Sequence, residues 1–187
     1  MRYFLAFLVT IALLITLIFV IFNDGGNNGK PRPVVSKKSL ASYYNTDAEA
    51  RMTIDGTVNS NQEHQQMQIS VNKNDVTFVE NQGYDGKAVS IRKYANTENS
   101  YSAFLSALAN AGFTKGENNT KLGSESGVCP LGQRYIFQFI QDGKDIERYW
   151  ATTCGPPQTY LGSTRQTVTL FQAQVPDYDE LTNELDL

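Results

Sequence analysis

The sequence has few of the residues on which catalytic and metal sites are usually built. Its 187 residues include one histidine, His64, and two cysteines, Cys129 and Cys154, which do not form a Cys-x-x-Cys pair. Acid–base catalysis near neutral pH most often uses histidine, and zinc or redox centres need more thiol or imidazole groups than these. No catalytic residue, cofactor site or metal site is therefore predicted.

Basic residues are also scarce in the larger part of the chain. Residues 39–187 contain eleven Lys and Arg against eighteen Asp and Glu, a net charge of −7. Proteins that bind nucleic acid usually carry a basic patch or stripe that contacts the phosphate backbone. Nucleic acid is therefore not an expected partner.

Charge is absent from one long stretch near the N-terminus. Residues 3–22 (YFLAFLVTIALLITLIFVIF) contain neither charge nor proline, and a helix of that length spans about 30 Å, the thickness of the hydrocarbon core of a bilayer. A cleavable signal peptide has a shorter apolar core and a small-x-small cleavage site, and a core helix of a soluble domain keeps a polar face. The sequence predicts an uncleaved signal-anchor, residues 1–22, as a single-pass transmembrane helix in the plasma membrane.

The composition changes abruptly after this helix. Residues 23–38 (NDGGNNGKPRPVVSKK) are rich in Gly, Asn and Pro and predict a flexible basic linker. Its four basic residues, weighed against Arg2, favour a cytoplasmic domain under the positive-inside rule, but long domains cross membranes largely regardless of charge. Because two cysteines suit an oxidising compartment, we expect residues 39–187 to form an extracytoplasmic domain.

The pattern of residues 39–187 predicts an α+β fold, in which an antiparallel sheet is packed by one or two helices. Period-two alternation predicts a meander of four strands, near residues 52–55, 64–72, 76–80 and 88–94. The apolar spacing then changes to i, i+3, i+4 and i+7 from Tyr101, which predicts an amphipathic helix that ends at Gly112. Shorter helices are expected near residues 40–44 and 164–174 and in the tail, 177–187.

A hairpin is predicted at Asp142-Gly143, because this dipeptide between alternating apolar runs is typical of a two-residue turn. In the register that such a turn sets, Tyr135 faces Trp150, and Cys129 lies two residues from the partner of Cys154. A small bulge would bring the two sulfur atoms together. We therefore predict a Cys129–Cys154 disulfide that closes the hairpin, in preference to a metal or redox pair.

Several stretches of the chain together point to a known group. They are the anchor with its linker, Ile54-Asp55-Gly56, Tyr101 to Phe113, Cys129-Pro130-Leu131-Gly132, Ala151-Thr152-Thr153-Cys154-Gly155, and Leu170 to Tyr178. In this combination the sequence resembles small, uncharacterised membrane-anchored extracytoplasmic proteins of the candidate phylum Saccharibacteria, over nearly its whole length. The resemblance implies a place in the cell envelope of a reduced bacterium that lives on other bacteria, and it implies no activity.

Aromatic residues suggest where a partner would bind. Tyrosine, of which there are ten, and tryptophan are favoured anchors of binding surfaces because they are large, stiff and able to hydrogen-bond. We predict a possible binding patch near the hairpin from Tyr84, Tyr94, Tyr149, Trp150 and Tyr160. The alternative is that most of these rings fill the core while their polar atoms reach water.

Two classes of function follow from these features. The favoured one is a binding or adhesion module, or a subunit of an envelope complex, with an unknown protein or glycan partner. The alternative is an envelope-associated hydrolase, which needs a cleft around His64 or a carboxylate pair such as Asp55 with Glu63 or Asp145 with Glu147. His64 stands at the head of a polar-apolar strand, which favours a surface or strand-end histidine over a catalytic one.

Overall fold

A computed structural model describes residues 39–185 and 187 of this chain. The predicted anchor, residues 1–22, and the predicted linker, residues 23–38, lie outside the described residues. None of the helices that the structure does describe combines the length and the apolar character needed to cross a bilayer.

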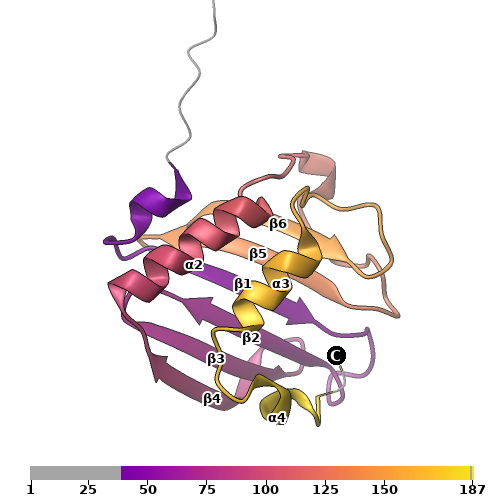
Figure 1. Ribbon diagram of the computed structural model, residues 1–187. Helices are drawn as coiled ribbons and strands as arrows, with labels where there is room; N and C mark the ends of the chain where they lie inside the picture. Colours follow the sequence, from indigo (N-terminus) through magenta and orange to yellow (C-terminus); the bar gives the residue numbers. More distant parts are fainter. Residues whose placement is uncertain (1–38, 186) are drawn as a thin grey trace, which may run out of the picture. The chain divides into compact units, whose positions relative to one another are not determined.

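A six-stranded sheet with the strand order β4-β3-β2-β1-β5-β6 forms the centre of the domain (Figure 1). Every pair of neighbouring strands is antiparallel. The strands are β1 (Glu49–Asp55), β2 (Gln65–Val71), β3 (Asp75–Gln82), β4 (Lys87–Ala95), β5 (Arg134–Gln141) and β6 (Lys144–Thr152). This arrangement confirms the predicted α+β class, and β1 to β4 form the predicted meander.

Two helices, α2 (Glu98–Ala111) and α3 (Thr164–Gln172), lie on one face of this sheet (Figure 1). The hydroxyl oxygen of Thr97 caps α2 by accepting a hydrogen bond from the backbone N–H of Ser100, and Gly112 ends the helix with φ 81°. The shorter helical elements are η1 (Leu40–Tyr43), η2 (Thr120–Leu122) and α4 (Tyr178–Thr182). The opposite face of the sheet carries neither α2 nor α3.

The core lies between the sheet and these two helices. Alternation along β1 directs Met52 and Ile54 toward the helices, and α2 buries the four side chains that the helical spacing predicted, Tyr101, Phe104, Leu105 and Leu108. The rings of Phe104 and Phe171 meet edge to face, with their centroids 5.2 Å apart, which joins α2 to α3. Each such side chain contributes about 1.5–3 kcal/mol through removal of apolar surface from water.

The β5–β6 hairpin turns at Asp142-Gly143, where both residues have positive φ angles, 52° and 71°. Positive φ angles at both central residues are characteristic of a type I′ turn, and the predicted two-residue turn is confirmed. However, a bulge close to the turn shifts the register by one residue, so that Tyr135 faces Ala151 and not Trp150. The predicted Tyr135–Trp150 pairing is therefore wrong, and Trp150 lies on the face of the sheet opposite α2 and α3.

The predicted disulfide between Cys129 and Cys154 is confirmed. Their Cα atoms lie 5.7 Å apart, within the usual range for a disulfide. The bond joins the segment that precedes β5 to the segment that follows β6, and so closes the open end of the hairpin.

Candidate functional site

Four loops lie at one end of the sheet, which we call the loop end. They connect β1 to β2 (residues 56–64), connect β3 to β4 (83–86), precede β5 (127–133) and follow β6 (153–158). They share this end because every pair of neighbouring strands is antiparallel. The chain enters β1 at the other end, where the side chain of Lys73 in the β2–β3 turn bonds to the Asn45 carbonyl oxygen at 3.2 Å.

The loop end is held together by covalent and hydrogen bonds. Besides the disulfide, the backbone N–H of Val58 donates to the carbonyl oxygen of Pro130 at 2.7 Å, which joins the β1–β2 loop to the segment before β5. Gly132 fits tightly here, because a Cβ on this residue would overlap the Thr153 hydroxyl and lie 2.7 Å from the sulfur of Cys129. These loops are therefore fixed relative to the sheet.

Three large apolar side chains are exposed on these loops. Leu131 is 88% exposed, Val58 46% and Tyr84 51%, and each comes from a different loop. We call these three residues the loop-end apolar surface. Apolar side chains that gather on fixed loops are typical of a binding surface.

Tyr84 is positioned by a stacked ring and two hydrogen bonds. Its ring lies nearly parallel to that of His64, with the centroids 3.9 Å apart, and its hydroxyl bonds to the backbone N–H and carbonyl oxygen of Asn59, at 3.2 and 3.1 Å. One face of the phenol ring therefore covers His64, while about half of the side chain remains exposed to solvent. This geometry holds an aromatic side chain ready for contact without further ordering.

His64 itself is completely buried and directly precedes β2, so of the two predicted locations the strand end is confirmed and the surface is wrong. Its Nε2 lies 2.9 Å from Oδ1 of Asp55, and its Nδ1 lies 3.0 Å from the carbonyl oxygen of Thr57. Both partners are acceptors, so both contacts are hydrogen bonds only when the ring carries two protons. The burial arises because the β1–β2 loop folds back over the ring.

Asp55 links this histidine to a buried arginine. Its Oδ2 lies 2.7 Å from Nη2 of Arg134, which also donates to the carbonyl oxygen of Gly56, while Oδ1 accepts from Gln66 at 2.7 Å. The Arg134 side chain is only 3% exposed, so Asp55 supplies the counter-charge that such burial requires. The cluster holds the β1–β2 loop against β5, which is a structural role.

The predicted carboxylate pairs have separate contacts. In each pair the carboxylates accept hydrogen bonds from different neighbours: Glu63 from Ser60, Asp145 from Gln138, and Glu147 from Tyr149. Across residues 39–185 and 187, no group of three or more His, Cys, Asp and Glu side chains could hold a metal ion. Each of these three carboxylates therefore has a hydrogen-bond partner of its own.

The five aromatic residues of the predicted binding patch do not form one surface. Tyr149, Trp150 and Tyr160 are buried, and Tyr94 packs against the core from β4, so only Tyr84 is strongly exposed. The burial has a visible cause at Trp150, whose indole N–H donates to the Leu122 carbonyl oxygen at 2.8 Å beneath the η2 loop. At Tyr160, burial raises the pKa of the phenol, whose hydroxyl bonds to Thr167 at 2.6 Å.

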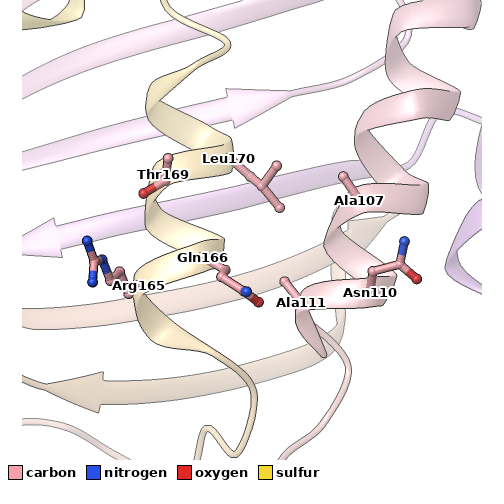
Figure 2. A pocket seen from close by; sticks show the side chains of 7 residues that line it. All are labelled: Ala107, Asn110, Ala111, Arg165, Gln166, Thr169 and Leu170. Atoms are coloured by element: carbon pink, nitrogen blue, oxygen red, sulfur yellow. The ribbon is translucent and has the colours of Figure 1, made fainter.

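A groove with a volume of about 740 Å³ lies between α2 and α3. Figure 2 shows that Gln166 and Leu170 extend from α3 toward Ala107 and Ala111 of α2, whereas Arg165 points to the other side of α3. The remaining lining residues are Asn110 and Thr169. The lining combines small, amide, hydroxyl, aliphatic and guanidinium side chains, which can hold a ligand through packing and hydrogen bonds.

Comparison with protein-family models, with curated proteins and with solved structures found no match for this chain.

Proposed function

We propose that this chain is a membrane-anchored binding module whose domain lies on the extracytoplasmic side of the plasma membrane. In this proposal residues 1–22 are the single-pass anchor, and the partner is a protein or glycan of the cell envelope. The observation that carries the proposal is Leu131, a leucine that is 88% exposed on a loop fixed by a disulfide. Such a side chain, together with Val58 and Tyr84 on neighbouring loops, offers a partner apolar contact area.

The direction in which the chain enters the domain supports this proposal. Residue 39 leads through η1 into β1, and the loop end lies at the far end of that strand. The seven residues of β1 span about 20 Å. The chain therefore enters the described domain at the end opposite the loop end.

The fixed loops also favour binding energetically. Association loses free energy when flexible loops become ordered, by about 0.5–1.5 kcal/mol for each immobilised side chain. The disulfide, the Val58–Pro130 hydrogen bond and the Asp55 cluster order these loops before any partner arrives. A larger part of the contact energy is then available for affinity.

Hydrolysis has less support from the geometry. A general base must come within hydrogen-bond reach of the proton that it removes. His64 is fully buried, and Asp55 and Thr57 occupy both of its ring nitrogens. Reaching a substrate would require the β1–β2 loop and Tyr84 to leave the ring.

The test is crosslinking on intact source cells with a membrane-impermeant, amine-reactive reagent. We expect the wild-type chain to form a discrete crosslinked species, and Leu131→Asp to reduce its yield about tenfold, because a charge replaces an apolar anchor. Leu161→Asp is the matched control, since Leu161 is also an exposed leucine (54%) but lies outside the four loops of the loop end. Equal yields from the two variants would contradict the proposed surface.

A further inference from the structure

Strand β4 is an outer strand of the described sheet, and its hydrogen-bond ladder shows which backbone groups face outward. The N–H of Asn96 donates to the carbonyl oxygen of Asn74 at 2.8 Å, and the pairing with β3 continues in register from there to Ser90. In an antiparallel ladder, alternate residues bond to the neighbouring strand. Ile91, Lys93 and Ala95 therefore direct their N–H and C=O groups away from β3.

The side chains on this edge are partly apolar. Ile91 is 54% exposed and Val89 50%, and Ile91 lies opposite Val79 on the face of the sheet that carries neither α2 nor α3. A bulge interrupts the ladder near Val89, but residues 90–95 are regularly paired. An edge with outward backbone groups and exposed aliphatic side chains can accept another strand.

The charge of β4 indicates which strand would fit. The strand contains Lys87, Arg92 and Lys93 and no acidic residue, although residues 39–187 carry a net charge of −7. Arg92 donates to the carbonyl oxygen of Ile91 at 3.2 Å, and Nζ of Lys93 lies 4.0 Å from a carboxylate oxygen of Asp75. Their charges are therefore weakly compensated, and a second copy of β4 would add further positive charge to this edge.

We propose that β4 is a docking edge for an extended, acidic segment of another protein, which adds a seventh strand to the sheet. Backbone hydrogen bonds to Ile91 and Lys93 provide affinity, aliphatic side chains of the segment pack on Ile91, and its carboxylates lie beside the basic side chains. This edge is separate from the loop-end apolar surface, so either one can fail experimentally without the other. The competing reading is that the lysines and the bulge only protect the edge from pairing.

Two labelled nine-residue peptides, blocked at both ends, serve as probes for the full-length chain in detergent. One alternates valine with glutamate and the other alternates valine with lysine, and binding is followed by fluorescence anisotropy. We expect the glutamate peptide to bind at least about tenfold more tightly. Reversing the basic charges with Arg92→Glu and Lys93→Glu together is expected to reverse this preference.

Ile91→Pro tests the backbone contact directly. Proline removes an N–H that points away from β3, so the ladder within the domain is retained while the peptide loses a hydrogen bond and about tenfold in affinity. Ile91→Thr is the control, because it keeps the N–H and a β-branched side chain, and we expect it to retain most of the affinity. Thermal unfolding shows whether each variant is folded. If Ile91→Pro is not folded, the peptide preference of the Arg92→Glu and Lys93→Glu double variant tests the proposal instead.

Three results would overturn the proposal. They are binding of neither peptide, equal binding of both peptides by the wild-type chain, and unchanged binding by a folded Ile91→Pro variant. Self-association of the chain that Ile91→Pro abolishes, without any peptide binding, would instead assign the edge to a second copy.

Discussion

At the scale of single residues, Asp55 is the side chain on which the loop end depends most. It is the carboxylate that contacts both His64 and Arg134, and both of these side chains are almost completely removed from water. Removing one partner of a buried ion pair leaves an uncompensated charge, which costs more than the pair itself contributes. The residue therefore links the stability of the domain to the position of the β1–β2 loop.

Replacing Asp55 by Asn tests this dependence. We expect the free energy of unfolding, measured by urea denaturation, to fall by about 3 kcal/mol, the lower end of the range for broken buried pairs, since the Asp55 side chain is partly exposed. Asp145→Asn, which alters an exposed carboxylate bonded to Gln138, is expected to stay within about 0.5 kcal/mol of wild type. Similar losses in both variants would show that Asp55 has no special role.

Tyr101 provides a pH-dependent prediction. Burial, and secondarily the charge of Glu49, raise the pKa of its phenol above the usual value of about 10. Because the folded state holds this proton more tightly than the unfolded state does, the stabilisation is present below pH 10 and is lost as the pH rises further, by about 1.4 kcal/mol per pH unit for each such group.

Tyr101→Phe should therefore make the free energy of unfolding fall less steeply above pH 10, as measured by denaturation at a series of alkaline pH values. Near pH 7 the variant is expected to lose about 1 kcal/mol, because the hydroxyl no longer donates to the Ala48 carbonyl oxygen at 2.8 Å. Some slope should remain, since burial also raises the pKa of Tyr135, Tyr160 and Tyr178. An unchanged slope would contradict the assignment.

At this scale the sequence predicted whether a residue lies in a loop, a helix or a strand better than it predicted the burial and the neighbours of its side chain. The exposed Leu131 lies in the sequence Cys129-Pro130-Leu131-Gly132, whose proline and glycine indicate a loop. Its exposure could not be predicted, because periodicity assigns exposure only within helices and strands. His64 was expected at a surface or a strand end because it heads a polar-apolar strand beside Glu63 and Gln65, and the β1–β2 loop that covers it has no periodic pattern from which burial could be predicted. Most of the five aromatic residues of the predicted patch are buried by segments distant in the chain, and the local sequence does not show which segments these are.

At the scale of secondary-structure elements, the segment after α2 is held against β6 at a glycine. Gly116 forms an isolated bridge with Tyr160, and a Cβ on Gly116 would overlap the ring of Tyr149. Tyr149 belongs to the core between the sheet and the helices. The segment can approach β6 this closely because Gly116 has no side chain.

Gly116→Ala is therefore expected to lower the free energy of unfolding by about 1–3 kcal/mol, the usual range for overpacking, as measured by urea denaturation. Gly123→Ala is the matched control, because Gly123 has a right-handed helical backbone, and the nearest atom to its added Cβ is the Thr120 carbonyl oxygen at 3.5 Å. The control should be neutral or slightly stabilising, since alanine restricts the unfolded chain. Equal destabilisation of both variants would contradict the packing argument.

The disulfide gives a second prediction for the elements that it joins. Replacing Cys129 and Cys154 together by Ser should lower the free energy of unfolding by about 3.5 kcal/mol, the value that the chain-entropy model assigns to a loop of this length. Amide hydrogen exchange should increase first at residues 127–133, which include Leu131 of the loop-end apolar surface. Wild-type stability with unchanged exchange in these residues would show that the bond does not hold the loop end.

The elements themselves were largely predictable from the sequence. The helix from Glu98 to Ala111, the four-stranded meander and the turn at Asp142-Gly143 each have a strong local signal. The pairing of β5 with β1 joins residues far apart in the chain, and the bulge in the β5–β6 ladder lies between Phe139 and Ile140. Neither leaves a periodic pattern, so the β1–β5 pairing was not predicted and the register of the hairpin was predicted one residue out.

At the scale of the whole molecule, the proposed protein is an apolar N-terminal anchor followed by a small acidic domain with a disulfide. The two cysteines are the feature of the sequence that favours the proposed location outside the cytoplasm, since the four basic residues of the linker favour the other side. The loop-end apolar surface and the basic edge of β4 are useful to an envelope protein only if that location is correct. The location is therefore the claim on which the proposed function depends.

The most direct measurement of that claim is surface labelling of intact source cells. An azide-bearing residue in place of Leu161, which is exposed and outside the loop end, is reacted with a membrane-impermeant alkyne before and after lysis, and the labelled chain is followed into the alkali-washed membrane fraction. We expect equal labelling before and after lysis, with the labelled chain retained in the membranes. Labelling only after lysis, or release of the chain into the soluble fraction, would contradict that claim.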